Sequence, residues 1–379
     1  MRKFTILSTL LLLLAITSSV SASTSDPLTI SGDIRLRFDN QTNYNYPNFN
    51  ADKYRIRLNA NYKFSPEWTF NSRLVVGESL FGSEPGHASS SYYPVVVDTL
   101  QYDVANFTYK KPDWNIAVGR QVFSIFEGLA VSMDDGHSAG DAGYPASTTP
   151  ARPDGGRAKN YPSFDGVKAQ NSVGKMTITS FLGNLNSRIS DGSNCRVGGI
   201  AAIAPAGQVN IGAMWYTSDA YISATDKTAN VKYCTLGTKN GYSLTANTKL
   251  LHNYLYTGAE YIWGLASTHD KAWKLILKTP DVKKAGDMQY SVEYRNIQSN
   301  ALDYTSYTGN PYNSTNYGLS SAYKSISYGD YTYWSMAAKR LLTKSIYATL
   351  FFEKYNPTAH TGSSQVEDHI TRLEVGYSF

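Results

Sequence analysis

Charge is scarce in this chain, and no block of like charge occurs in it. Asp, Glu, Lys and Arg together make up 17% of the residues, below the average of about 25% for soluble domains. The formal net charge is +5 and there is no polybasic tract, so nucleic acid is not an expected partner. Beyond the apolar stretch at residues 4–16, no segment has the continuous apolar length of a transmembrane helix. A membrane protein without such helices must be a closed β-barrel, because lipid cannot satisfy open backbone groups.

Signatures of catalysis and of metal binding are also missing. The sequence has no HExxH pair and no GxSxG elbow, and it offers no clustered nucleophile and base of the kind that a lipase or protease needs. No His lies at ligand spacing from either cysteine, which argues against zinc. The acidic stretch at residues 134–141 lacks the ligand spacing of a calcium loop and is interpreted as a solvated turn. We therefore expect no enzyme, no cofactor and no metal.

The N-terminus has the pattern of an export signal. Arg2 and Lys3 precede an apolar stretch at residues 4–16, and Val20-Ser21-Ala22 fits the small-x-Ala cleavage pattern. We predict a signal peptide over residues 1–22 and a mature domain over 23–379. A retained anchor is the alternative, but the apolar stretch is short for one.

Two cysteines, Cys195 and Cys234, are present. An even count in an oxidising compartment favours a disulfide, here one that pins two adjacent external loops. Unpaired thiols are the alternative.

Alternation with a period of two begins at Leu28. Apolar side chains of residues 28–38 fall on one face and polar ones on the other, and residues 53–64 repeat the pattern. Both runs are about twice the five or six residues of an ordinary strand, which is the length a tilted membrane-spanning strand needs.

Short turns and long polar segments follow each other along the chain. Seven short turns are predicted near residues 65–67, 111–113, 172–175, 205–207, 251–252, 280–286 and 342–344. This layout predicts an all-β, transmembrane antiparallel barrel with short periplasmic turns and long external loops. A β-solenoid would show one fixed repeat length, which is not seen. The count gives about 16 strands. Because residues 201–264 alternate weakly, 14 or 18 remain open.

The last strand carries a further mark. Leu373, Val375, Tyr377 and Phe379 alternate on one face, and Phe379 ends the chain. This pattern resembles the C-terminal signal by which bacterial outer-membrane barrels are read by their insertion machinery. An ordinary edge strand is the alternative.

Three further segments carry a family resemblance: residues 30–35 (ISGDIR), 113–121 (DWNIAVGRQ) and 164–167 (FDGV). With the last strand, they make the chain similar to the general porin family of bacterial outer membranes. More narrowly, it resembles the barrel part of the major outer-membrane porins of diderm Firmicutes. Those porins usually carry an N-terminal surface-layer homology domain, which is not expected here because the strand pattern starts close to the predicted cleavage site.

The resemblance implies a homotrimer embedded in outer-membrane lipid. It also implies passive diffusion of small hydrophilic solutes and ions through a water-filled pore. Two alternatives stay open. One is a substrate-selective channel for sugars, phosphate or organic anions, and the other is a plugged structural or adhesive barrel.

A barrel of about 16 strands leaves an aqueous channel unless something folds inside. The longest loop, residues 122–163, exceeds what a hairpin needs. It is expected to fold inward and constrict the pore. Its charged residues are Glu127, Asp134, Asp135, Asp141, Arg152, Asp154, Arg157 and Lys159.

The opposite wall is expected to be basic. The polar phase of the strands carries Arg35, Arg37, Arg55, Arg57, Arg73 and Arg372. Arg120 joins them if a bulge at Gly119 redirects it, because strict alternation turns it toward lipid. Facing charges would set a transverse field across the pore, with weak anion preference unless the loop carboxylates reverse it. The alternative is that these arginines simply pair with Asp33, Asp39 or Glu374.

Overall fold

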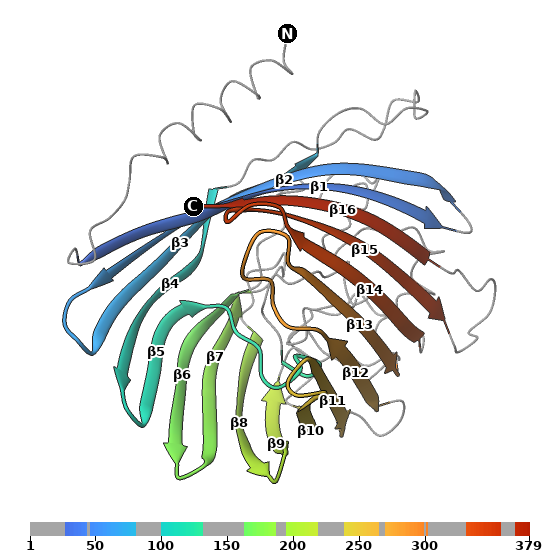
Figure 1. The fold of residues 1–379 in the computed structure, drawn as a ribbon. Coiled ribbons are helices and arrows are strands. Elements are labelled where there is room, and N and C mark those ends of the chain that lie inside the picture. The colour runs from blue at the N-terminus through green and yellow to red at the C-terminus, as the bar shows by residue number, and fades with distance from the viewer. Residues whose placement is uncertain are drawn as a thin grey trace, which may run out of the picture.

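The computed structural model describes residues 27–43, 46–80, 100–131, 163–186, 195–218, 239–264, 270–298, 301, 331–357 and 368–379. Sixteen antiparallel strands form one closed barrel, in which neighbours in sequence are neighbours in the wall. Figure 1 shows the strands following one another around the wall from β1 (blue) to β16 (red). The predicted fold class is confirmed, and the count is 16 rather than 14 or 18. The expected signal peptide lies outside the described residues.

The strands alternate in direction along the chain. They are β1 (Leu28–Asn43), β2 (Tyr46–Lys63), β3 (Trp68–Leu80), β4 (Leu100–Lys111), β5 (Trp114–Gln121), β6 (Ser163–Val173), β7 (Met176–Asn186), β8 (Cys195–Ala206), β9 (Val209–Ser218), β10 (Lys239–Leu250), β11 (Leu255–Trp263), β12 (Ala272–Lys278), β13 (Met288–Ile297), β14 (Tyr331–Leu341), β15 (Ile346–Pro357) and β16 (Asp368–Ser378). Each of the seven predicted short turns joins two of them.

Local chemistry explains the tightest turns. Gly174 between β6 and β7 and Gly207 between β8 and β9 have φ of 60° and 67°, values that glycine adopts without steric cost. The first external connection differs from expectation. The layout predicts long external loops, but β1 continues to Asn43 and β2 starts at Tyr46.

Closure joins the two ends of the described chain. Strand β1 pairs with β16 from Asp33 opposite Ser378 to Asn43 opposite Asp368. Phe379 and Gly32 then exchange backbone hydrogen bonds of 3.0 and 2.9 Å. Every strand thus has two partners and no edge is left open, as a wall surrounded by lipid requires. No helix in the described part of the chain is long and apolar enough to cross a membrane.

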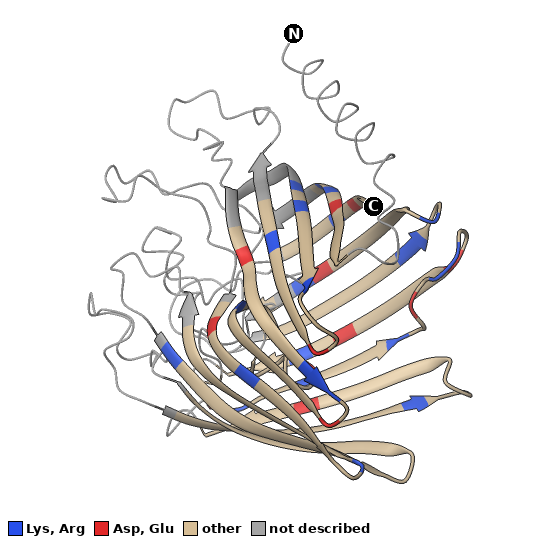
Figure 2. Ribbon diagram, turned by 90° about the vertical axis from the view of Figure 1, so that its left-hand side faces the viewer, with Lys and Arg blue, Asp and Glu red and all other residues tan. Residues whose placement is uncertain are grey.

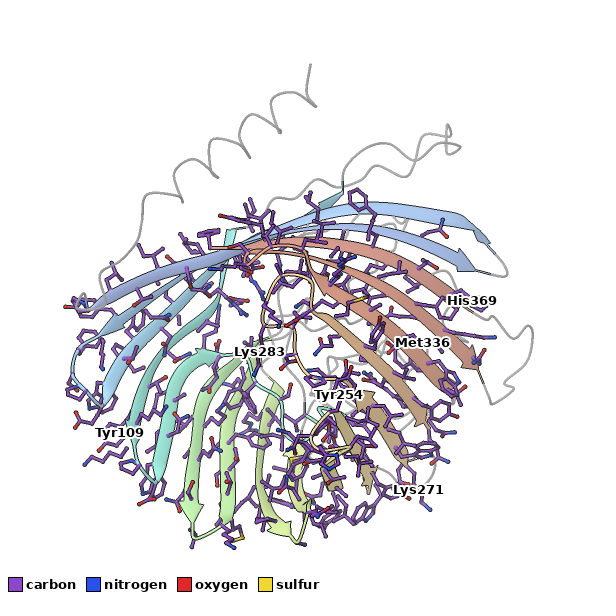
Figure 3. All side chains as sticks on the ribbon, in the orientation of Figure 1. Tyr109, Tyr254, Lys271, Lys283, Met336 and His369 are labelled. Carbon is purple, nitrogen blue, oxygen red and sulfur yellow. The ribbon has the colours of Figure 1, made fainter. Side chains whose placement is uncertain are left out.

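The two faces of the wall have opposite character. Large apolar side chains on the outer face are exposed, among them Trp68, Trp114 and Met336, and Figure 3 shows Tyr109 and Met336 on the outer side. The rings of Trp68 and Tyr109 lie 4.9 Å apart beside the short turns, as expected for an interfacial aromatic belt. Charged side chains on the strands are concentrated on the inner face. Figure 2 shows Lys, Arg, Asp and Glu on the strands as well as in the turns.

Candidate functional site

A band of charged and hydroxyl side chains runs along the inner face from β11 through β16 and β1 to β4. We call it the inner polar belt. Its members are Glu260, Lys274, Glu293, Arg295, Tyr333, Glu353, Arg372, Glu374, Asp33, Arg35, Arg37, Arg55, Arg57, Arg73 and Asp103. Period-two alternation on the strands other than β4 puts their members inside, because the neighbours in sequence point outward. Asp103 lies at a register shift between β3 and β4 and binds Arg73 on the inner face.

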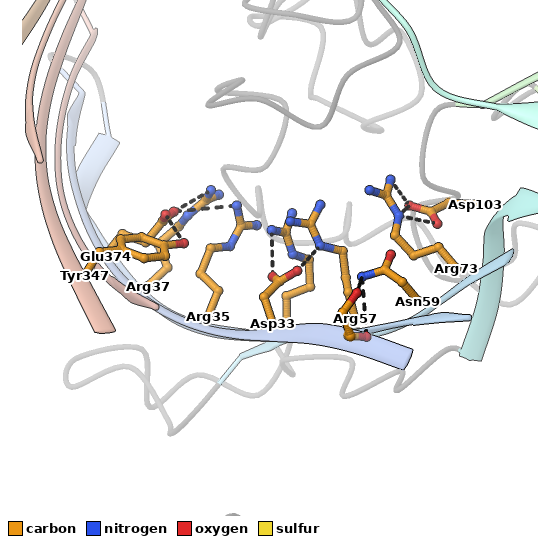
Figure 4. A network of polar contacts seen from close by, with 11 residues as sticks. Asp33, Arg35, Arg37, Arg57, Asn59, Arg73, Asp103, Tyr347 and Glu374 are labelled. Carbon is orange, nitrogen blue, oxygen red and sulfur yellow. Dashed lines mark hydrogen bonds and ion pairs between the residues drawn. The ribbon is translucent and has the colours of Figure 1, made fainter. Parts of the chain in front are cut away.

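Glu374 on β16 is the first junction of the arginine part of the belt. Its carboxylate lies 3.2 Å from the Arg37 guanidinium and 3.5 Å from that of Arg35. The hydroxyl of Tyr347 donates to its other oxygen at 3.2 Å. Figure 4 shows the three side chains converging on Glu374 from β1 and β15. The closure of the barrel therefore brings the last strand's carboxylate to the first strand's arginines.

Asp33 on β1 is the second junction. It accepts from Arg57 Nε at 2.7 Å and from Arg55 at 3.4 Å. Arg35 and Arg55 stand directly opposite each other in the β1–β2 register, an arrangement that repels. Because Asp33 and Glu374 bind one each, the repulsion is offset. These two acids are among the partners that the alternative interpretation named. The side chain of Asp39 lies outside the described residues.

Arg73 on β3 forms the third junction. Its Nε and one terminal nitrogen bind the two oxygens of Asp103 on β4, at 2.8 and 2.6 Å. Such a bidentate pair fixes the orientation of both groups. Asp103 is nearly buried while Arg73 keeps part of its side chain in solvent.

Accessibility divides the arginines into two groups. Arg35, Arg37, Arg55 and Arg372 retain only 0–4% exposure. Arg57, Arg73 and Asp33 keep 15–18% of their side chains exposed. Within the arginine part of the belt, Arg57 on β2 and Arg73 on β3 are therefore the guanidinium groups that solvent reaches.

Arg120 does not belong to this wall. Pairing of β5 with β4 and β6 runs without a shift through Gly119, so Arg120 shares the outward phase of Trp114 and Val118, both exposed. Its guanidinium binds Asp165 at 2.8 Å on that outer face. The assignment of Arg120 to the basic wall is wrong, because Gly119 has a φ of 121° but inserts no extra residue.

Residues 122–131, the start of the longest loop, run along the inner face of the barrel, from β6 and β7 at Phe123 to β10, β11 and β12 at Glu127. We call them the inward segment. Figure 1 shows the chain leaving β5 and crossing toward β10 and β11. Phe123, Ile125, Leu129 and Val131 are buried. Burial of these apolar side chains gives the segment its driving force to leave the water.

Glu127 attaches the inward segment to three strands. Its carboxylate accepts from the Tyr256 hydroxyl at 2.5 Å and from the Asn247 amide at 3.4 Å. Its backbone carbonyl accepts from Lys274 Nζ at 2.6 Å. Glu127 therefore fixes the inward segment to β10, β11 and β12.

Glu260 on β11 holds the segment from the other direction. The backbone N–H groups of Leu129 and Ala130 donate to its two oxygens at 2.9 and 3.3 Å, and the Ser243 hydroxyl donates at 2.7 Å. Glu260 is buried. Loop N–H groups inside a protein need acceptors of this kind.

An aromatic patch receives the first residues of the segment. Phe123 packs edge-on against Phe164 and Phe181, with ring centroids 5.2 and 5.6 Å apart. Lys168 Nζ lies 5.0 Å from the Phe123 ring centre, a cation–π distance. The inner face of β6 and β7 thus carries an aromatic cluster with Lys168 beside it.

Several expected site residues lie outside the described part of the chain: Asp134, Asp135, Asp141, Arg152, Asp154, Arg157 and Lys159. So do Cys234 and the side chain of Cys195, the first residue of β8. Leu373, Val375 and Tyr377 lie on the outward phase of β16, and the rings of Tyr377 and Phe379 stack at 5.9 Å.

Sequence reasoning missed the carboxylates and cations of β11 to β15. Lys274 binds Glu293 at 3.2 Å, Arg295 also binds Glu293, and Tyr333 donates to Glu353 at 3.0 Å. The available signal was a charged residue within a short, otherwise apolar strand, as in AWKLILK of β12. Alternation around each of these positions would have placed them inside.

No protein-family model matches the sequence, and no curated protein matches it. Solved structures match almost the whole chain. The loop L8 deletion mutant of OmpT, an outer membrane protein of Vibrio cholerae, has a TM-score of 0.51 and 11% identity, over 93% of this chain and 100% of that one. In-vitro folded OmpT in its trimer form gives 0.51 and 10%, with the same coverage. A mutant Rhodobacter blastica porin gives 0.48 and 11%, over 93% and 100%. Identities this low establish the fold alone, that of an outer-membrane barrel.

Proposed function

We propose that the protein is a porin of the bacterial outer membrane, through which small hydrophilic solutes and ions diffuse passively. One observation carries the proposal. A closed 16-stranded barrel holds an inward segment docked on β10 to β12, and the arginine part of the inner polar belt lies on β16 and β1 to β3. A barrel of this size leaves an aqueous lumen unless something fills it, and the docked segment is proposed to narrow that lumen.

Selectivity is assigned to the arginine side of the belt. From β15 around to β4 the belt carries Arg35, Arg37, Arg55, Arg57, Arg73 and Arg372 against Asp33, Asp103, Glu353 and Glu374. The cations outnumber the anions, which supports a weak preference for anions. Because Arg57 and Arg73 are the partly exposed cations, they are the ones expected to contact a passing solute. Facing charges in a narrow passage tune ion preference.

The remaining features complete the proposal. Residues 1–22 direct export, and the C-terminal strand with Phe379 is read by the barrel-insertion machinery. A Cys195–Cys234 disulfide ties two external loops. Outer-membrane lipid surrounds the exposed apolar face, and three copies assemble, as in the trimer form of Vibrio cholerae OmpT. Membership of the general porin family, and the narrower likeness to porins of diderm Firmicutes, is supported by the sequence segments named above. The function is transport, not catalysis.

A plugged structural barrel is the second candidate. The near-complete burial of Arg35, Arg37, Arg55 and Arg372 favours it, because a wide water-filled lumen would leave arginines exposed. A substrate-selective channel is the intermediate case: its lumen would be open, but narrower than that of a diffusion porin.

Proteoliposome swelling separates these functions. Purified, refolded protein in liposomes is placed in isotonic solutions of neutral sugars of increasing size. The porin predicts swelling rates that fall smoothly with solute size, with no saturation. A selective channel predicts rates that saturate for one solute. No swelling, from protein shown by circular dichroism to be folded, would contradict the proposal and support the plugged barrel.

A further inference from the structure

Lysines line the inner side of the barrel at the end where the short turns lie. They are Lys63 on β2, Lys110 on β4, Lys249 on β10, Lys278 on β12 and Lys339 on β14, each within three residues of the end of its strand. Period-two alternation turns them inward, because sequence neighbours such as Tyr62, Leu250 and Leu277 are exposed on the outer face. Figure 2 shows blue segments at several of these turns and strand ends.

Three of these residues, Lys249, Lys278 and Lys339, stand on alternate strands, and we call them the mouth lysines. Tyr256 on β11 lies directly opposite Lys249 on one side and Lys278 on the other. Lys249 and Lys278 are therefore at the same height, two strands apart. Neighbouring strands lie about 4.8 Å apart, so the two backbones are about 10 Å from each other. Their long, flexible stems let both ammonium groups reach one solute between them.

Asp281, in the turn after β12, shows that this place holds an anion. Its carboxylate binds Lys278 Nζ at 2.8 Å and accepts from the Gln289 amide at 2.6 Å. These two hydrogen bonds lower the pKa of Asp281, and the positive charges of Lys278 and Lys339 lower it further. Gln289 stands opposite Lys339 in the β13–β14 register. The Asp281 side chain is 72% exposed, so an anion of higher charge can take its place.

The mouth lysines carry more positive charge than nearby acids neutralise. Lys249 is exposed, and the Nζ of Lys339 lies 4.3 Å from the centre of the Tyr347 ring. In the described part of the chain, neither lysine forms an ion pair. Glu127 is the other carboxylate nearby, and one of its oxygens accepts from Tyr256 at 2.5 Å. With Asp281 and Glu127 set against three ammonium groups, a positive charge remains.

We propose that the mouth lysines form a binding site for multivalent anions at the turn end of the pore. A phosphate-bearing or polycarboxylate solute carries several negative charges and binds two or three ammonium groups at once, whereas chloride has a single charge to offer. The two ends of the pore therefore differ in their affinity for such solutes. The inference rests on the porin proposed above and names a class of solute that this porin retains.

Block of the pore by tripolyphosphate tests the site. Single channels are recorded in 0.1 M potassium chloride, with tripolyphosphate added first to one compartment and then to the other. Wild-type channels are expected to be blocked at a lower concentration from one side. This block should weaken in 1 M potassium chloride, because the Debye length falls from about 10 Å to about 3 Å.

Two double variants remove equal charge from the same end of the barrel. Lys249→Gln/Lys339→Gln takes away two mouth lysines and should weaken the one-sided block about tenfold, since an exposed ion pair accounts for up to about fivefold. Lys111→Gln/Arg340→Gln is the matched control, because both residues lie on the outward phase of their strands. The control should be blocked like the wild type.

Asp281→Asn tests the site in the opposite direction. It removes the carboxylate that competes for Lys278 and should strengthen the block about threefold. Equal block of the wild type from both sides, equal loss of block in the two double variants, or a weaker block in Asp281→Asn overturns the proposal.

Calorimetric titration of the detergent-solubilised proteins with tripolyphosphate measures the same differences without a current. Conducting channels in which neither measurement distinguishes Lys249→Gln/Lys339→Gln from its control would refute the site and leave the porin standing. Silent barrels that bind tripolyphosphate more tightly with the mouth lysines than without them would refute the porin and keep the site.

Discussion

Replacing Glu260 with alanine is expected to release the inward segment from β11. The variant removes the acceptor for the backbone N–H groups of Leu129 and Ala130. Hydrogen bonds to a charged group contribute about 1.5–3 kcal/mol each, so the docked state loses about 3–6 kcal/mol. At 1.4 kcal/mol for each factor of ten, the ratio of docked to undocked segment falls by roughly 10²–10⁴.

Other contacts limit the displacement. Glu127 keeps its bonds to Tyr256 and Lys274, so the segment is expected to move in and out rather than leave the lumen. Single-channel recordings should therefore show a larger mean conductance together with stepwise fluctuations. Thermal unfolding of the variant should begin at a lower temperature, because the apolar side chains of the segment are no longer held against the wall.

Ser243→Ala is the matched control. It removes a different hydrogen bond from the same carboxylate and leaves both loop N–H groups satisfied. Its conductance should equal that of the wild type, with at most a small loss of stability. Glu260→Ala protein that is folded, and yet has wild-type conductance and noise, would refute the idea that this carboxylate holds the segment.

Three further perturbations test other parts of the molecule. Arg57→Gln should move the reversal potential under a salt gradient toward cation preference and Asp33→Asn toward anion preference; equal values for both variants would contradict a selective role for this junction. The pKa of Asp287, in the turn between β12 and β13, is lowered by hydrogen bonds from the backbone N–H groups of residues 283 and 284. Its contribution to turn stability is present above the ordinary carboxyl pKa and lost as pH falls through the lowered one. Protection of those two amides from hydrogen exchange should therefore disappear in acid, and in Asp287→Asn it should be weak at every pH. Deletion of Phe379 removes two backbone hydrogen bonds to Gly32, about 1–3 kcal/mol, and should lower the urea midpoint of refolded barrels; an unchanged midpoint would show that these bonds do not stabilise the closure.

Strand length and turn chemistry made most of the fold predictable. Runs such as residues 53–64 are too long for a soluble sheet and have the period of a strand, so they indicate a membrane wall before any contact is known. Turn residues such as Gly174 and Gly207 then set where each hairpin reverses. Even the weakly alternating region between residues 201 and 264 contained the expected number of strands, because its turns were still recognisable.

The phase of alternation also placed most of the arginine wall, since parity along a strand fixes the face. Arg120 was assigned to the wall by assuming a bulge at Gly119, against strict alternation. Strict alternation pointed it outward, and the register through Gly119 follows that alternation. A glycine with positive φ changes the local twist without adding a residue, so the side chains keep their faces.

The docking of the inward segment could not be read from the sequence. Glu260 lies far from Leu129 in the chain, and their contact depends on how far the segment reaches across the barrel. Sequence parity gives the face of Glu260 but not its partner. The same holds for Asp103, whose bond to Arg73 crosses a register shift between β3 and β4.

Single-channel current across a planar bilayer, under a gradient of potassium chloride, tests the central claim most directly. Purified wild-type protein is expected to give large ohmic steps, with a reversal potential that indicates modest anion preference from the arginine side of the belt. Folded protein that inserts but passes no current would contradict the account, and the buried arginines would then belong to a plugged barrel.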